Sequence, residues 1–317
     1  MTTTNFETIT VIGGAGFVGR SIVTALEQKG LNVKIVHAPR LTLRDGMQQS
    51  CLPPEAFGAE TVTLSQHLIG SLVVINAAGN PDASSHDLGL LLGPNAALPV
   101  LISRASDLAK VKRFIHVSSA AVQGNHAVLD NSFNLFPFSP YSQSKAFGEV
   151  WLLSEQQKTT EVTIYRPPGV HGVNRTVTER IRTLASSPFS SVAGTGSSKT
   201  PQALLENVGD AIAFLATTCE MPRQIVHHPW EGLSSADLLR CLGNREPHHL
   251  PHWLARSLIN CVKLAERPLR FIAPNRRRLE LLWFGQGVAP SWLEQQGWVP
   301  PLNRDRWFEL GKPASKR

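Results

Sequence analysis

The stretch TITVIGGAGFVGRSIVTALEQKG, residues 8–30, joins a short apolar run to spaced glycines and then to a helical pattern. Residues 8–12 are apolar and β-branched, which predicts a strand. Apolar side chains recur at helical spacing from residue 17 to about residue 29, and residues 32–36 supply a second strand. Gly13, Gly16 and Gly19 therefore predict a tight turn that holds a dinucleotide pyrophosphate at a helix N-terminus.

Strands and helices alternate outward from this unit. The nearly continuous apolar runs SLVVIN and RFIHVS are typical of strands buried on both faces of a sheet. Alternation with right-handed crossovers predicts an α/β fold with a Rossmann-type doubly wound parallel sheet. Strands are expected at 8–12, 32–37, 60–64, 71–76, 112–117 and 161–166, and helices at 17–29, 95–109, 141–157, 175–186 and 207–219.

A second motif lies in PYSQSKAFGE, residues 140–149. Tyr141 is one of only two tyrosines, and Lys145 follows it by four residues, so that both share one face of a helix. A neighbouring ammonium favours the ionised phenol and is expected to lower its pKa from the usual value near ~10. The pair predicts a tyrosine that accepts the proton of an alcohol as the carbinol carbon is oxidised.

Five motifs in order carry a family resemblance: the G-x-x-G-x-x-G turn, NAAG at 76–79, VSSAAV at 117–122, YSQSK at 141–145 and YRPPGVHG at 165–172. Together they resemble the extended short-chain dehydrogenases/reductases, that is, the NAD-dependent epimerase/dehydratase family. The resemblance runs from residue 8 to about residue 220. It implies an NAD(P) cofactor and a homodimer.

The resemblance implies roles for the matched positions. Ser119 would hydrogen-bond the reacting oxygen, with its neighbour Ser118 as the second choice. Tyr141 would be the acid/base, and Lys145 would hold the nicotinamide ribose. Asn95 would support this set, although an asparagine at a helix start is equally well explained as an N-cap.

The same resemblance implies the cofactor contacts. His37 stands where members that prefer NAD carry an acidic residue for the ribose hydroxyls, and Arg40 is close enough in sequence to pair with a 2′-phosphate. This favours NADP over NAD, unless Arg40 is a solvated loop residue. The implied cofactor-binding set is Gly13, Gly16, Phe17, Val18, Gly19, His37, Arg40, Asn76, Ala77, Ala78, Gly79, Tyr141, Lys145 and Pro168.

Departures from the family pattern limit which reactions and substrates are expected. Alanines follow Ser119 where sugar 4,6-dehydratases have an acidic pair, and alanine cannot serve as acid or base, which disfavours dehydration. The arginine that often clamps a nucleotide diphosphate is missing near residue 200, and Lys199 is the nearest cation. The implied substrate contacts are Ser118, Ser119, Gln123, Tyr141 and Lys199.

Three functions remain open on the sequence. The first is an NAD(P)-dependent oxidoreductase or epimerase acting on a hydroxyl or keto carbon, with a sugar nucleotide as the expected substrate. The second is a hydroxysteroid-dehydrogenase-like or other ketone reductase. The third is a non-catalytic NAD(P)-sensing protein, which the retained Tyr141 and Lys145 disfavour.

The C-terminal quarter differs in composition. Residues 240–317 carry 14 Lys and Arg against 6 Asp and Glu, whereas residues 1–239 carry 17 against 18. Six of the seven tryptophans lie from residue 230 onward. We expect residues 1–170 with about 200–230 to form the dinucleotide-binding domain, and about 171–199 and 231–317 to form a smaller, basic and Trp-rich substrate-binding cap. A cationic cap suits an anionic substrate.

A membrane surface, nucleic acid and a metal ion are other conceivable partners of this quarter. Residues 253–271 could lie on an anionic membrane surface, although an amphipathic stretch more often faces a protein core. Nucleic acid is not expected, because no recognised module accompanies the charge. No carboxylate or thiol lies among His248, His249 and His252, and Pro247 and Pro251 break the helix, so no metal site is expected.

The remaining composition indicates the cytoplasm. The four cysteines are scattered without CxxC spacing, which is typical of reduced thiols. The start MTTTNFETIT shows no signal-peptide pattern, and no apolar run approaches the ~18–20 residues of a membrane span.

Overall fold

The computed structural model describes residues 8–43, 51–155, 159–220, 222–265 and 273–312. Its centre is a six-stranded sheet in the order β10-β6-β4-β3-β1-β2, and every neighbouring pair in it is parallel. This confirms the predicted Rossmann-type sheet. The strands are β1 (Thr8–Ile12), β2 (Val33–Val36), β3 (Ser71–Asn76), β4 (Arg113–Val117), β6 (Glu161–Arg166) and β10 (Ile225–His227).

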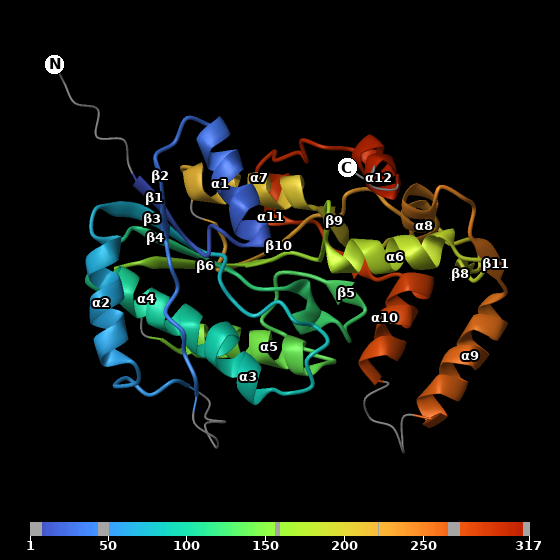
Figure 1. The fold of residues 1–317 in the computed structure, drawn as a ribbon, viewed down its shortest axis with the longest axis horizontal. Coiled ribbons are helices and arrows are strands. Elements are labelled where there is room, and N and C mark those ends of the chain that lie inside the picture. The colour runs from blue at the N-terminus through green and yellow to red at the C-terminus, as the bar shows by residue number, and fades with distance from the viewer. Residues whose placement is uncertain (1–7, 44–50, 156–158, 221, 266–272, 313–317) are drawn as a thin grey trace.

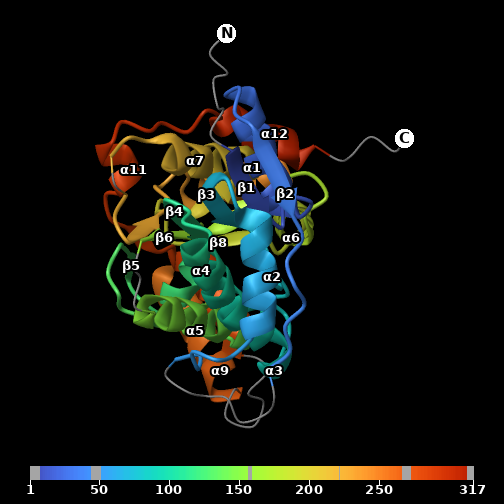
Figure 2. The ribbon, with the colours of Figure 1, turned by 90° about the vertical axis from the view of Figure 1, so that its left-hand side faces the viewer.

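Helices cover both faces of the sheet (Figures 1 and 2). On one face α1 (Phe17–Gln28) packs against α7 (Leu205–Thr217). The opposite face carries α2 (Gly58–Leu68), α4 (Leu98–Leu108) and α5 (Pro140–Ser154). The central strands are therefore buried on both sides, which is why their sequences are almost continuously apolar.

The strand order reverses at β1. Its neighbours are β2 on one side and β3 on the other, so the loops that follow β1 and β3 diverge at the carboxyl edge of the sheet. Open α/β sheets bind their ligands at such a switch point. The glycine turn lies at this edge.

One predicted strand is wrong. Residues 60–64 lie inside α2, where Thr61, Leu64 and Leu68 are buried at helical spacing. The β-branched run ETVTL suggested a strand, but packing of one helical face against α4 decides its structure.

Other boundaries shift by a few residues. The helix expected at 95–109 begins as a π-helical turn, η1 (Gly93–Ala97), before α4. The helix expected at 141–157 is helical to Ser154, and 156–157 lie outside the described residues. The shorter elements are α3 (Gly89–Leu92), η2 (Ala120–Gln123), β5 (Val128–Leu129), β7 (Gly169–His171), β9 (Gln202–Leu204), α11 (Trp292–Gln295) and β12 (Gly287–Val288).

A second group of elements lies beyond the carboxyl edge of the sheet (Figure 1). Its core joins Ala185, Leu238, Leu242 and Trp307. The elements are α6 (Thr176–Ser186), β8 (Ser191–Ala193), α8 (Ser235–Gly243), β11 (His248–Leu250), α9 (His252–Ala265), α10 (Ala273–Phe284) and α12 (Arg304–Gly311).

The end of the chain does not belong wholly to this second group. Trp292 and Trp298 pack into the core beside β1, α1 and α7, and Trp298 Nε1 donates to Asp210 on α7 at 2.9 Å. The expected domain boundaries stay a prediction.

Candidate active site

The glycine turn after β1 is shaped by close backbone approach. Gly13 has φ +81, and a Cβ there would lie 2.6 Å from the amide nitrogen of Ala78. A Cβ at Gly19 would lie 2.0 Å from the carbonyl oxygen of Gly13. These contacts exclude side chains at both positions, so the glycine turn packs directly on the loop that follows β3, and the first turn of α1 packs back on the glycine turn.

The N-terminus of α1 fits a dinucleotide pyrophosphate. Gly16 is its N-cap, and among the described residues no side chain caps its first amides. Such amides, together with the helix dipole, bind anionic groups. Phe17 begins the helix, and the guanidinium carbon of Arg175 lies 4.6 Å from the centre of its ring. Val18 follows Phe17 in the helix.

The loop after β3 is fixed against this turn. Ala77 N donates to Ile12 O at 2.9 Å. The buried side chain of Asn76 accepts from Ala78 N at 3.0 Å and contacts His116 Nδ1 at 3.2 Å. Asn76 therefore shapes the backbone of the loop, and exposed Gly79 follows it at the edge of the sheet.

The start of α5 positions the tyrosine. Ser139 caps the helix in a reciprocal pair with Ser142, and Pro140 occupies the first turn. Tyr141 is half-buried there, and the Ser119 side chain is close enough to act on the pKa of its phenol. Ser119 is itself the N-cap of η2 and accepts from Ala121 N at 3.2 Å. Two predicted catalytic residues thus meet.

Lys145 lies one helical turn beyond Tyr141 and is buried. Its Nζ donates to Val117 O at 3.2 Å and would lie 3.3 Å from a Cβ at Gly79. Burial lowers the pKa of Lys145 to about 8, while the Glu149 carboxylate acts to raise it. The ammonium therefore lies between α5 and the loop after β3, beside the glycine turn.

The expected lowering of the tyrosine pKa is wrong for this arrangement. Burial raises the pKa of Tyr141 above its usual value, and the hydrogen bond from Ser119 and the charge of Arg175 only partly oppose this. The cation that acts on the phenol is Arg175, before α6, rather than the expected Lys145. The phenol is protonated at neutral pH and can donate a proton.

Asn95 supports the site without reaching its hydroxyl groups in the described structure. It lies in η1, where its amide donates to Asn80 O and to Ser144 Oγ at 3.1 and 3.0 Å. Its oxygen accepts from Asn80 N at 2.9 Å. The side chain ties the loop after β3 to α5, so it is neither a helix N-cap nor in contact with the Tyr141 hydroxyl in this structure.

Two predicted substrate contacts are engaged elsewhere. Ser118 is buried and donates to Glu149 Oε1 at 2.5 Å, because adjacent residues of an extended segment point to opposite sides. Gln123 is fully buried, and its amide donates to Asp130 Oδ1 at 2.7 Å and to Asn134 O. Both side chains have partners within the protein, and their assignment as substrate contacts stays a prediction.

Glu149 and Arg166 form an ion pair that was not predicted. Their closest oxygen and nitrogen are 2.6 Å apart, and each side chain is only 1% exposed. Glu149 also binds Ser118 and acts on Lys145, so one carboxylate joins both halves of the site. The sequence did contain a signal for the role of Glu149, because this residue follows Lys145 by four positions and so lies on the same helix face.

The remaining predicted residues lie at the periphery. His37 and Arg40 are exposed in the segment after β2, and Pro168 is half-buried just after β6. Lys199 is exposed and stacks over the Trp230 ring at 4.7 Å. The described structure shows no contact between Lys199 and Ser119 or Tyr141.

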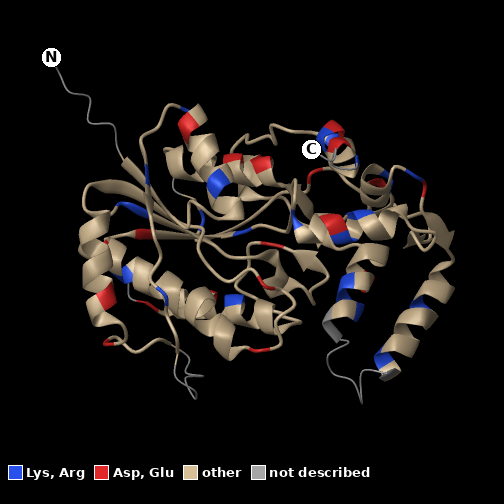
Figure 3. Ribbon diagram, in the orientation of Figure 1, with Lys and Arg blue, Asp and Glu red and all other residues tan. Residues whose placement is uncertain are grey.

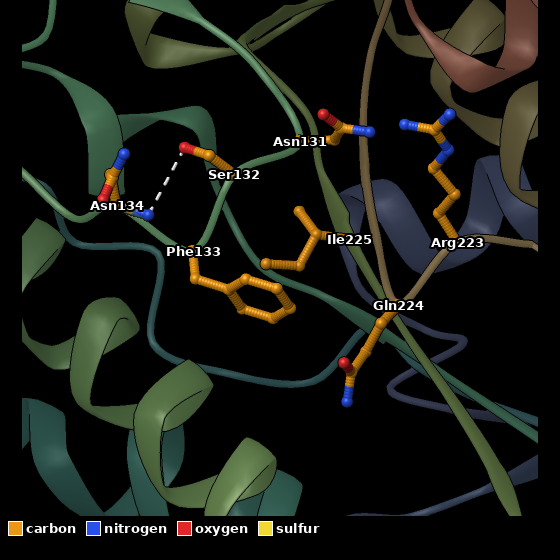
Figure 4. A pocket seen from close by; sticks show the side chains of 7 residues that line it. All are labelled: Asn131, Ser132, Phe133, Asn134, Arg223, Gln224 and Ile225. Atoms are coloured by element: carbon orange, nitrogen blue, oxygen red, sulfur yellow. Dashed lines mark hydrogen bonds between the residues drawn. The ribbon is translucent and has the colours of Figure 1, made fainter.

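A cavity of about 530 Å³ opens elsewhere on the surface (Figure 4). The described residues that line it come from the loop 131–134 and from residues 223–225, at the start of β10. They include none of the predicted site residues. In the described part of the chain no group of three or more His, Cys, Asp and Glu could hold a metal ion. No helix described there is long and apolar enough to cross a membrane.

Comparison with known proteins agrees with the motifs. The family model described as "NAD dependent epimerase/dehydratase family" matches residues 9–226. A curated relative from Stigmatella aurantiaca, 4-hydroxy-2-methyl-3-oxo-4-farnesyl-3,4-dihydroquinoline-1-oxide ketoreductase, is 26% identical over 179 residues. This match covers 52% of the present chain and 51% of the relative, so the chain spans about half the length of that protein.

Solved structures share the fold. A dTDP-4-dehydrorhamnose reductase from Bacillus anthracis in complex with NADP superposes with a TM-score of 0.63 at 14% identity, covering 96% of this chain and 97% of that one. A UDP-glucuronic acid 4-epimerase from Bacillus cereus in complex with NAD superposes with a TM-score of 0.63 at 15% identity. The superposition covers 96% of this chain and 94% of that one. At such identities the likeness shows the fold alone.

Proposed function

Because the chain belongs to the NAD dependent epimerase/dehydratase family, we propose that it interconverts a hydroxyl and a keto carbon of its substrate with NAD(P). What supports this is the proximity of Ser119 to Tyr141, close enough for the serine hydroxyl to act on the pKa of the phenol, with Lys145 one turn further on. These groups lie at the carboxyl edge of a sheet whose glycine turn fits a pyrophosphate.

Each residue has a role in the proposed mechanism. Ser119 orients the reacting oxygen by a hydrogen bond. Tyr141 exchanges a proton with the same oxygen, and its raised pKa keeps it ready to donate toward a carbonyl. Lys145, fixed by Val117 O, faces the place of the cofactor ribose and keeps a positive charge beside the site. Bound nicotinamide would supply or accept the hydride at the carbon.

The charge on Lys145 gives the reaction a pH dependence. Its pKa of about 8 lies below that of a free lysine, so the ammonium is charged below pH about 8 and neutral above it. We expect kcat/KM to fall as the pH rises through about 8. Glu149→Gln should move this fall to lower pH, because the lost carboxylate acts to raise the lysine pKa.

A pH-rate profile of both proteins tests this. The raised pKa of Tyr141 places its own ionisation at higher pH and separates the two events. Identical profiles for wild type and Glu149→Gln would remove Lys145 from the pH dependence.

We propose NADP(H) as the preferred cofactor. The end of β2 bears His37 rather than a carboxylate, and exposed Arg40 is free of a carboxylate partner in the described structure. Arg40→Ala should weaken the binding of NADPH about 10- to 100-fold, which is the effect of losing one charge-assisted hydrogen bond. The affinity for NADH should not change. Titration of the intrinsic tryptophan fluorescence with each cofactor measures this, and an equal loss for both would contradict it.

A sugar nucleotide is the first proposed substrate class. The reductase and the epimerase compared above are named for such substrates, and the basic C-terminal quarter suits their diphosphate. A hydrophobic ketone is the second class. It is supported by the ketoreductase relative, whose name describes a farnesylated dihydroquinoline oxide.

One assay separates these possibilities. The absorbance of NADPH is followed with a 4-keto-sugar nucleotide and, separately, with a prenylated bicyclic ketone, using Tyr141→Phe as the blank. Net oxidation of NADPH identifies a reductase and its substrate class. Conversion of a sugar nucleotide to its epimer without net oxidation identifies an epimerase. No turnover with either class would contradict both assignments.

A further inference from the structure

The helices α9 and α10 form a hairpin at one end of the molecule. They lie side by side and extend away from the other elements of the second group (Figure 1). Their core is small and includes Ala255, Ile259, Ala193 and Trp283. Much of the α9 surface therefore faces away from the protein. Residues 266–271 of the amphipathic stretch 253–271 lie outside the described residues.

The outward face of α9 exposes large apolar side chains. Trp253 is 70% exposed and Leu264 is 65% exposed. They are three helical turns apart and so lie on one line of the helix. Leu258, 44% exposed, widens this stripe on the side away from the basic residues. Exposed Ser257 and Asn260 lie between Trp253 and Leu264 along this line, so the stripe is apolar at both ends and polar in its middle.

Basic residues flank the stripe. Arg256 and Lys263 are both exposed and lie two turns apart on one edge of it. The sequence of α9 contains no Asp or Glu, and Figure 3 shows only Lys and Arg among the charges on this helix. The one carboxylate of α10, Glu280, is already paired with Arg276 and Arg277. Among the described residues of the hairpin, Arg256, which stacks over the Phe284 ring, and Lys263 therefore present positive charge without a carboxylate partner beside exposed apolar groups.

The hairpin is also connected to the site. On α10, Arg278 donates to Ala83 O in the loop after β3, and Arg277 Nε donates to Gly124 O at 2.8 Å, just after η2. Both acceptors follow segments that carry predicted site residues, Gly79 and Ser119. The hairpin therefore contacts loops that follow two segments of the candidate site.

We propose that the outward face of α9 docks on the surface of an anionic lipid bilayer. Trp253 and Leu264 would enter the boundary between headgroups and acyl chains, and Arg256 and Lys263 would contact lipid phosphates. This is the arrangement of interfacial helices, which combine Trp and Leu on one face with flanking cations. The inference does not depend on the proposed reaction.

Sedimentation with lipid vesicles tests the proposal on the full chain. We expect the protein to pellet with vesicles of equal parts phosphatidylcholine and phosphatidylglycerol, but not with phosphatidylcholine alone. Added salt should release it, because exposed charges are screened. Trp253 fluorescence should shift to shorter wavelength on binding, whereas the shift should be absent in Trp253→Ser.

Two double variants separate charge from apolar contact. Arg256→Glu/Lys263→Glu should lower vesicle binding at least about 25-fold, or about fivefold for each cation. Trp253→Ser/Leu264→Ser should lower it comparably. The matched control for net charge is Lys110→Glu/Lys112→Glu, two exposed lysines at the start of β4, which should retain binding. For the apolar pair it is Ile69→Ser/Val299→Ser, also exposed.

The outcomes against the proposal are distinct. Equal binding by wild type and both hairpin variants, or no binding of wild type to anionic vesicles, would overturn it. Self-association in gel filtration that Trp253→Ser/Leu264→Ser abolishes, without vesicle binding, would instead assign the face to a second copy of the chain. Unchanged thermal melting of the variants shows that the fold is intact.

Discussion

Tyr141→Phe should lower kcat by about 10²- to 10⁴-fold while leaving cofactor affinity nearly unchanged, because it removes one hydroxyl that exchanges the substrate proton. The ring still fills its half-buried position at the start of α5. Ser119 loses a hydrogen-bond partner, but it still accepts from Ala121 N. Steady-state kinetics together with a cofactor titration measure the two effects separately.

The other tyrosine supplies the matched control. Tyr165 is fully buried in β6, and its hydroxyl is 2.5 Å from His228 Nδ1. Tyr165→Phe leaves a buried imidazole nitrogen unpaired and should lower the free energy of unfolding by about 1–3 kcal/mol, with kcat unchanged. If Tyr141→Phe keeps wild-type turnover, or if Tyr165→Phe loses it equally, the proposed acid/base role is wrong.

Arg166→Met should lower the free energy of unfolding by about 3–5 kcal/mol, because it leaves the Glu149 carboxylate buried without its cation. Both side chains of the pair are 1% exposed, so water cannot replace the lost partner. Urea unfolding should show the loss as a lower midpoint with an unchanged slope.

Two further variants make this result specific. The double variant Glu149→Gln/Arg166→Met should recover part of the loss, since it removes the unpaired charge. Arg240→Met breaks two surface ion pairs, with Glu246 and with Asp237, and should lower the midpoint far less than Arg166→Met does. A midpoint for Arg166→Met equal to that of Arg240→Met would show that the buried pair adds no stability.

The local features of the site could be predicted from the sequence. The turn Gly13 to Gly19 requires glycine because backbone atoms meet there, and this requirement is written in the spacing. Tyr141 and Lys145 share a helix face because four residues make about one turn. The order of the family motifs then implied that Ser119 belongs to the same site, and in the structure it lies close to Tyr141.

Features that depend on distant residues were missed or reversed. The run 60–64 has strand-like residues, but its contacts with α4 make it part of a helix. Ser118 and Ser119 are chemically equal in the sequence, and only the extended backbone at the end of β4 points one toward Glu149 and the other toward Tyr141. The tyrosine pKa was expected to fall, because burial cannot be judged from four neighbouring residues.

The sequence by itself determined the family, the parallel sheet, the glycine turn and the tyrosine–lysine pair, because each follows from spacing within a few turns of backbone. Tertiary structure alone decided which hydroxyl faces the site, that Glu149 and Arg166 are paired beneath it, and that burial outweighs nearby charge at Tyr141. It also decided that the apolar stripe of α9 lies on the surface. Those outcomes depend on which segments exclude water from which side chains, and this is settled only when distant parts of the chain pack together.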